Sequence, residues 1–381
     1  MGNRTSSNSS YTLNPASPKT PLFTNAIYRI PSLIYIKDDK TFLAFAEKRT
    51  SPADVDATVL VMRRGTKQNG AIQWSPVEEL TTASLEGHRT MNPCPVYEKN
   101  SKTVFLFFNC VFDKFTEQEQ IHNRKNRARL CYVTSQDSGK TWSSTTDLTE
   151  SVIGKEIKKW ATFSVGPGHG IQMCNGRLII PAYVYYIVSC CTCCCICSSC
   201  CCSVKPYAFA FYSDDQGVTW HFGQRVSVES AECEMAEITD SNGKSYLYCN
   251  ARSSKKSRVE ARSQNGGEDF SVNSTGKLVE TPGGCQGSVV SFAHDEKTWL
   301  LFSHITDKNE RKDLGVYLNK SPFSANGWNK PSIINPGVSG YSDMTQCDSN
   351  DRFACLMERG TNKLEEIAFT EFSLNDIMKD Q

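Results

Sequence analysis

The chain lacks an excess of charge of either sign, with 42 Lys and Arg against 41 Asp and Glu. A dedicated nucleic-acid-binding protein usually carries a clear basic excess, so we expect no nucleic-acid partner. The 6 histidines show no H-E-x-x-H or comparable ligand spacing. We therefore predict no catalytic metal and no cofactor.

The first 21 residues lack the apolar segment of a secretory signal. We therefore expect folding in a reducing compartment, with most of the 18 cysteines present as thiols. Residues 1–21 are rich in Ser, Asn and Pro, which favours a disordered tail.

Apolar runs of helical length are also scarce, and most apolar runs have the length of strands. Examples are residues 41–46, 104–108, 178–181 and 299–302. Gly, Pro, Asn or Asp bound several of these runs, and aromatic residues make up 10% of the chain. This pattern predicts an all-β core, with a short helix only at about residues 373–379.

Two segments, 135–142 and 213–220, repeat the pattern S-x-D-x-G-x-T-W. The pattern predicts a tight β-hairpin, in which the Asp accepts backbone N–H bonds across its own turn. The Gly provides a positive φ, and the Trp packs against the layer below. Residues 263–270 form a weaker third copy, with Asn265 for Asp and Phe270 for Trp. A repeated all-β unit predicts a propeller, in which these hairpins are structural rather than catalytic.

Nine cysteines gather in residues 190–202, inside a run of 27 positions (178–204) without charge. The run is long enough to span a bilayer, although Pro181 and several Ser and Thr interrupt it. A metal cluster, an inert loop and an S-acylated loop facing a membrane are the other interpretations. We favour S-acylation, because Met1-Gly2 and Ser6 match the myristoylation pattern and stable anchoring needs a second acyl chain.

A series of further motifs runs along the chain. They are Tyr28-Arg29-Ile30-Pro31, Phe45-Ala46-Glu47-Lys48-Arg49, Gly87-His88-Arg89, Gly166-Pro167-Gly168-His169, Asn250-Ala251-Arg252, Gly284-Cys285-Gln286, Tyr341-Ser342-Asp343 and Leu356-Met357-Glu358. Together with the repeated hairpins, which match the Asp box, they resemble the vertebrate sialidases (exo-α-neuraminidases) over about residues 22–372. The membrane-associated, ganglioside-cleaving subclass is the most similar, although the Cys-rich run departs from it. The resemblance implies one six-bladed propeller at residues 22–381, with a Cys-rich inserted loop at about 189–204.

The resemblance also implies a catalytic set of Tyr341 as nucleophile, Glu232 as its general base and Asp54 as acid/base. Sialidases depart from the carboxylate nucleophile that most glycosidases use. A neutral phenol is not repelled by the substrate's own carboxylate, and an adjacent Glu can take its proton. Asp56 is the nearest competitor of Asp54, but Asp54 keeps the family's spacing from Arg49.

The resemblance implies further that Arg29, Arg252 and Arg311 hold the carboxylate of sialic acid, since guanidinium groups bind carboxylates bidentately. Glu358 is expected to orient Arg29, and Glu47 is also expected to have a supporting role. The expected contacts to the rest of the sugar are Arg49, Asn92, Glu117, Tyr183, Tyr185 and Gln286.

The resemblance predicts an exo-α-sialidase with a retaining mechanism, acting on gangliosides and also on glycoproteins. The expected partners are sialylated glycolipids, sialylated glycoproteins and a membrane surface. We expect peripheral or lipid-anchored attachment to the plasma or endosomal membrane, and otherwise a cytoplasmic protein. The alternative from another class is a non-catalytic sialoglycan-binding propeller, which would keep the three arginines and lose one of the catalytic residues.

Overall fold

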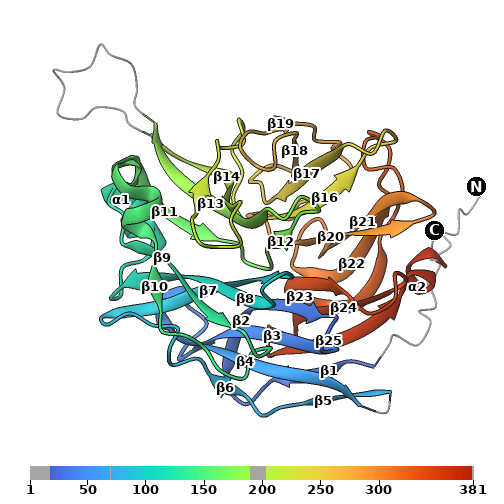
Figure 1. Ribbon diagram of the computed structural model, residues 1–381, viewed down its shortest axis with the longest axis horizontal. Helices are drawn as coiled ribbons and strands as arrows, with labels where there is room; N and C mark the ends of the chain where they lie inside the picture. The colour runs from blue at the N-terminus through green and yellow to red at the C-terminus, as the bar shows by residue number, and fades with distance from the viewer. Residues whose placement is uncertain (1–17, 69, 189–202, 380–381) are drawn as a thin grey trace, which may run out of the picture.

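The computed structural model describes residues 18–68, 70–188 and 203–379. The fold is all-β, and its sheets follow one another around a ring in chain order (Figure 1). The strands are β1 (Thr20–Phe23), β2 (Ile27–Ile36), β3 (Thr41–Arg49), β4 (Ala57–Gln68), β5 (Ala71–Trp74), β6 (Glu78–Glu79), β7 (His88–Glu98), β8 (Thr103–Phe112), β9 (Ala128–Ser135), β10 (Thr146–Asp147), β11 (Trp160–Val165), β12 (Ile171–Gln172), β13 (Leu178–Val188), β14 (Ser203–Ser213), β15 (His221–Phe222), β16 (Cys233–Thr239), β17 (Ser245–Ala251), β18 (Val259–Ser263), β19 (Ser271–Val272), β20 (Ser288–His294), β21 (Lys297–Ile305), β22 (Lys312–Asn319), β23 (Ser332–Gln346), β24 (Arg352–Arg359) and β25 (Glu366–Ser373). The helical elements are η1 (Asp54–Asp56), α1 (Glu117–Asn123), η2 (Thr149–Ile153), η3 (Gly154–Lys159) and α2 (Leu374–Met378).

Antiparallel pairing joins the described strands into five sheets rather than six separate blades. Four sheets are built on β2–β6, β7–β10, β11–β15 and β16–β19, and the fifth has seven strands in the order β1-β25-β24-β23-β22-β21-β20. The predicted propeller is confirmed, but the expected six blades form five hydrogen-bonded sheets, because the last sheet joins two four-stranded units that share β23. Its strand β23 is 15 residues long, and it pairs with β22 over its first part and with β24 over its second part.

The N-terminal strand closes the ring, because β1 pairs with the C-terminal strand β25 (Thr20 opposite Phe369). The expected tail at residues 1–21 is therefore too long, since Thr20 and Pro21 belong to β1. The rest of that prediction, at residues 1–17, lies outside the described residues. The expected Cys-rich loop also lies outside them, except for Ser203 and Val204, which belong to β14.

The three repeated hairpins fasten each sheet to the one before it. Asp137 accepts hydrogen bonds from the N–H groups of Lys140 and Thr141, both at 2.9 Å, and from the Thr141 hydroxyl at 2.7 Å. The Trp142 ring packs edge-on against Phe45 of the preceding sheet.

The second and third copies repeat this arrangement with Asp215 and Asn265 as acceptors. Trp220 packs on Phe107 of the second sheet, and Phe270 is buried in the cluster that contains Ile179 of the third sheet. The structural role predicted for these hairpins is confirmed.

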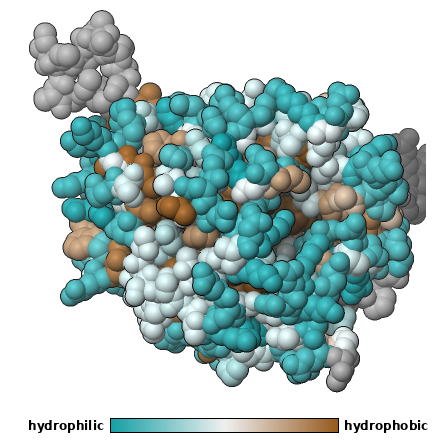
Figure 2. Space-filling model, viewed as in Figure 1, coloured by the Kyte–Doolittle hydropathy of each residue, from teal (hydrophilic) through white to brown (hydrophobic). Residues whose placement is uncertain are grey.

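The four apolar runs noted in the sequence lie in β3, β8, β13 and β21, so their assignment as strands is confirmed. The short helix predicted at the C-terminus is confirmed as α2, whereas the sequence analysis predicted no helix at the position of α1. The signal for α1 was a capping box, in which Thr116 and Glu119 each satisfy the backbone N–H of the other. In the described ranges, no helix is long and apolar enough to cross a membrane. The face seen in Figure 2 is mostly hydrophilic, with hydrophobic residues in small groups.

Candidate active site

A cavity of about 690 Å³ lies where the inner strands of the sheets meet. It is lined by all the residues predicted to act on or contact the substrate except Gln286. They are Arg29, Arg49, Asp54, Asn92, Glu117, Tyr183, Tyr185, Glu232, Arg252, Arg311 and Tyr341. Residues from every part of the chain thus meet at one place.

Irregularities in the inner strands position several of these side chains. The pairing register shifts between Arg29 and Ser32 in β2, between Met91 and Cys94 around Asn92 in β7, and between Ser339 and Ser342 around Tyr341 in β23. Such bulges bend a strand and redirect its side chains, and they are common beside active sites.

Buried carboxylates accept the backbone N–H groups at these irregularities. Glu358 accepts the N–H groups of Ile30 and Tyr341, both at 2.9 Å, and Glu47 accepts that of Asn92 at 2.7 Å. Both predicted supporting residues therefore lie beneath the cavity rather than in its wall.

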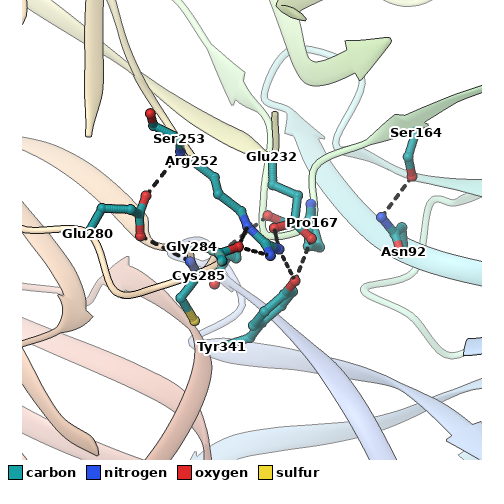
Figure 3. A network of polar contacts seen from close by, with 12 residues as sticks. Asn92, Ser164, Pro167, Glu232, Arg252, Ser253, Glu280, Gly284, Cys285 and Tyr341 are labelled. Carbon is teal, nitrogen blue, oxygen red and sulfur yellow. Dashed lines mark hydrogen bonds and ion pairs between the residues drawn. The ribbon is translucent and has the colours of Figure 1, made fainter. Parts of the chain in front are cut away.

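The predicted nucleophile and base are in direct contact (Figure 3). The Tyr341 hydroxyl donates to Oε1 of Glu232 at 2.5 Å. Nη1 of Arg252 donates both to this hydroxyl, at 3.0 Å, and to Oε2 of Glu232, at 2.7 Å. Burial, with the Glu232 carboxylate as the next cause, raises the pKa of Tyr341 well above its usual value. Tyr341 is therefore a neutral phenol in the resting site, with a proton acceptor already in place.

Three guanidinium groups surround Tyr341. Those of Arg29 and Arg311 lie 5.8 and 5.5 Å from the centre of its ring, and that of Arg252 contacts its hydroxyl. Glu358 binds Nε of Arg29 at 2.6 Å, as predicted, and raises the pKa of Arg29. This arrangement gives the floor of the cavity a concentrated positive charge, which suits an anionic ligand.

Asp54 extends over the cavity from the 3-10 turn η1, and its side chain is 73% exposed. Nη1 of Arg49 donates to it at 2.6 Å, while the other donors of Arg49 bind the buried Glu47. Asp56 instead binds Ser51 and Lys114 and does not line the cavity. The structure thus places Asp54, and not Asp56, at the site.

Tyr183 and Tyr185 come from β13 and pack edge-on at 6.1 Å. Tyr185 hydrogen-bonds Glu117, the first residue of α1. Burial, and then the charge of Glu232, raises the pKa of Glu117 to about 7. This wall therefore combines two aromatic faces with a carboxyl group that titrates near neutral pH.

Gln286 is the one predicted contact that the structure places elsewhere. It is buried, and its amide donates to the Ser342 carbonyl at 3.0 Å and accepts the Ser342 N–H at 3.1 Å. The nitrogen and the oxygen of its amide group thus both bind Ser342, the residue next to Tyr341. The expectation of a pocket-wall contact is wrong, because the inner strands cover this side chain.

Several polar residues of the cavity were missed by the sequence reasoning. Ser164 receives a hydrogen bond from Asn92 at 2.7 Å and donates to Asn109 at 2.8 Å, and all three line the cavity. Arg89 also lines it and lies within a motif noted in the sequence. Ser164 and Asn109 carried no sequence signal, because they come from separate sheets.

One group of described residues, His169, Glu234 and Asp343, has the spacing of metal ligands. Each of its carboxylate oxygens already accepts a hydrogen bond, from the Leu33 and Val289 N–H groups and from the side chains of Ser288, His169 and Gln286. Burial, with the neighbouring Asp343 as the next cause, raises the pKa of Glu234 well above its usual value. The group therefore functions as a hydrogen-bonded tie between the inner strands.

Comparison with known proteins defines the class. The model of the BNR repeat-like domain matches residues 40–352. Among solved structures, the chain resembles the Hadza microbial sialidase Hz136 (TM-score 0.74, 18% identity, 94% of this chain and 69% of that one). It also resembles the Trypanosoma rangeli sialidase in complex with 2,3-difluorosialic acid (TM-score 0.71, 17% identity, 97% and 60%). The fold is thus the sialidase β-propeller.

Relatives at higher identity place the chain within this class. It is 45% identical to sialidase-3 of Homo sapiens, over 92% of this chain and 90% of that protein. It is 44% identical to sialidase-2 of Mus musculus, over 94% and 96%. The chain belongs to the vertebrate sialidase family. It is a glycoside hydrolase of the neuraminidase type.

Proposed function

We propose that this chain is a retaining exo-α-sialidase with Tyr341 as its nucleophile, acting on gangliosides and also on glycoproteins. The observation that carries the proposal is the hydrogen-bonded group of Tyr341, Glu232 and Arg252, which lies beside Arg29 and Arg311 at the floor of the cavity. The alternative of a non-catalytic sialoglycan-binding protein does not account for a phenol placed 2.5 Å from a carboxylate.

The substrate binds with its carboxylate against Arg29, Arg252 and Arg311. Glu232 takes the proton of Tyr341 as the phenolic oxygen attacks the anomeric carbon, and Arg252 stabilises the developing phenolate. Asp54 donates a proton to the glycosidic oxygen, whose bond to the anomeric carbon breaks as the aglycone leaves.

In the second half of the reaction, ionised Asp54 takes a proton from water, which attacks the anomeric carbon. The bond to the Tyr341 oxygen breaks, and Glu232 returns the proton to the phenol. Two displacements at one carbon give net retention. The exposure of Asp54 suits this role, because both the aglycone and the water must reach it from solvent.

The remaining contacts hold the sugar ring and its arms. Arg49 and Asn92 contact the ring substituents, and Tyr183, Tyr185 and Glu117 hold the glycerol and N-acyl arms. Glu358 and Glu47 hold Arg29 and Arg49 in place.

A 2,3-difluoro sialic acid tests this mechanism, because a fluorinated sugar slows breakdown of a covalent intermediate. We expect peptide mass spectrometry to find the sugar on Tyr341, and Tyr341→Phe to remain unlabelled. Proton NMR of the hydrolysis should show the α-anomer released first. A label on another residue, or release of the β-anomer first, would contradict the mechanism.

We also propose that the chain acts at a membrane surface, held there by acyl chains on Gly2 and on the cysteines of residues 190–202. The proposal rests on those sequence motifs and on β13, which carries Tyr183 and Tyr185 into the cavity and ends directly before the Cys-rich segment. Anchoring next to the cavity would raise the effective concentration of membrane-embedded gangliosides.

Fractionation of cells that express wild type, Gly2→Ala and a variant with all nine loop cysteines changed to Ser tests this proposal. We expect membrane association in the first, weaker association in the second and a largely cytosolic third that loses ganglioside turnover selectively. A loop variant that stays on membranes, or a wild type that takes up no palmitate, would refute it.

A further inference from the structure

Backbone carbonyl groups, and not only carboxylates, hold two of the three clustered arginines. The Gly283 carbonyl accepts from Nε and Nη2 of Arg252, at 3.1 and 2.5 Å. The Gly284 carbonyl accepts from Nη2 of Arg311 at 2.9 Å. The direction of both guanidinium groups therefore depends on the conformation of the segment 281–285, which precedes β20.

This segment has an unusual conformation. Gly283 and Gly284 both have positive φ, +76° and +71°. A Cβ at Gly284 would lie 2.7 Å from Nε of Arg252. Only glycine allows this close approach without strain. Hydrogen-bond ties at the ends of the segment hold it in this conformation.

Glu280 provides those ties (Figure 3). Its Oε1 accepts the N–H of Cys285 at 3.0 Å, and its Oε2 accepts the N–H of Ser253 at 3.1 Å. Ser253 directly follows Arg252 in the chain. A single carboxylate thus joins the carbonyl-bearing segment to the backbone of the arginine that it holds.

Glu280 is itself fixed by a buried cation. Nη1 of Arg258 donates to Oε2 of Glu280 at 2.9 Å and also to the Cys285 carbonyl at 2.5 Å. Nε2 of His304 lies 3.1 Å from Oε1 of Glu280. Burial alone would raise the pKa of Glu280, but Arg258 and His304 outweigh it and lower that pKa to about 2. The carboxylate is therefore charged at neutral and mildly acidic pH.

We propose that Glu280 is a positioning residue for catalysis, which sets the direction of Arg252 and Arg311 towards the substrate carboxylate through the segment 281–285. This proposal rests on the proposed function. Glu280 does not line the cavity, so its effect passes through the two carbonyl groups and through the backbone of Ser253. Removing it loosens binding of the substrate carboxylate, which raises KM, and disturbs the contact of Arg252 with Tyr341, which also lowers kcat.

The first test variant is Glu280→Asp, which keeps the charge opposite Arg258 but withdraws the carboxylate by one methylene. The second is Gly284→Ala, which leaves the ion pair intact and displaces Arg252. The matched control is Glu98→Asp. Glu98 also has a buried side chain, and it accepts the N–H groups of Asn100 and Ser101 in the turn between β7 and β8, away from the cavity.

Steady-state kinetics on a fluorogenic sialoside and calorimetric binding of 2-deoxy-2,3-didehydro sialic acid provide the readouts, with melting temperature as the check on folding. For Glu280→Asp and Gly284→Ala we expect KM and the inhibitor Kd to rise about tenfold or more. We expect kcat to fall as well, because Arg252 also contacts the Tyr341 hydroxyl. Glu98→Asp should lower the melting temperature and leave KM unchanged.

A merely structural role would reduce the folded fraction, and so the apparent kcat, without moving KM. If either test variant is folded and keeps KM within twofold of wild type, the proposal is wrong. If the wild type neither hydrolyses the sialoside nor binds the inhibitor, the proposed function fails instead, so the two failures are distinguishable.

Discussion

Replacement of Tyr341 by Phe is the change that most directly tests the active site. It removes one oxygen atom, which donates to Glu232 at 2.5 Å and accepts from Arg252 at 3.0 Å. The ring stays, with the guanidinium groups of Arg29 and Arg311 beside it. The substrate carboxylate should therefore still bind, while the attacking atom is lost.

The expected cost in stability is small compared with the cost in rate. Oε1 of Glu232 loses its hydrogen-bond donor, but Oε2 keeps Arg252. Loss of one buried hydrogen bond to a charged group should lower the free energy of unfolding by about 1–3 kcal/mol. A lost nucleophile should lower kcat on the order of 10³-fold or more, with KM little changed.

Glu232→Gln provides the matched comparison, since the amide oxygen can still accept from Tyr341 but the amide cannot take its proton. If the two residues act as one unit, the double variant should be no slower than the slower single variant. The assay is kcat on a fluorogenic sialoside, with inhibitor binding and thermal denaturation as controls. A folded Tyr341→Phe protein within tenfold of wild-type activity, or additive losses in the double variant, would refute the assignment.

Three further predictions concern other parts of the molecule. Asp54→Ala should slow natural sialosides far more than activated aryl sialosides, whose leaving groups need little protonation; equal losses in both would point to misfolding or to Asp56. Glu117→Gln should remove a rise in KM above about pH 7, because deprotonated Glu117 repels the anionic substrate. The raised pKa of Glu117 also lowers wild-type stability as pH rises from about 4.5 to about 7, so unfolding of the Gln variant should depend less on pH in that window. Asp137→Ala and Asp215→Ala should each lower the free energy of unfolding by on the order of 1 kcal/mol, since water screens these exposed turns, with KM unchanged. A changed KM in either well-folded variant would show that these hairpins influence the site.

Local patterns in the sequence were enough to predict the elements that depend on neighbouring residues. The S-x-D-x-G-x-T-W hairpins were predicted because every partner of Asp137 lies within four positions of it. The apolar runs of strand length predicted β3, β8, β13 and β21, because the length of such a run is also a local property of the sequence. Family motifs added the residues of the cavity. They carried no information on how deeply each side chain is buried, and so Gln286 was placed in the cavity wall.

The sharing of β23 between two parts of one sheet, and the positions of the buried carboxylates, depended on tertiary structure. Glu358 joins Ile30 and Tyr341, which lie more than 300 positions apart, and Glu280 connects Ser253 with Cys285 across different loops. Such contacts form only when the ring closes, since loop closure brings together strands that no local spacing relates. The sequence by itself therefore determined the strands, the hairpins and the chemical types in the site. The closed propeller alone decided which carboxylates face solvent, as Asp54 does, and which hold the arginines from below.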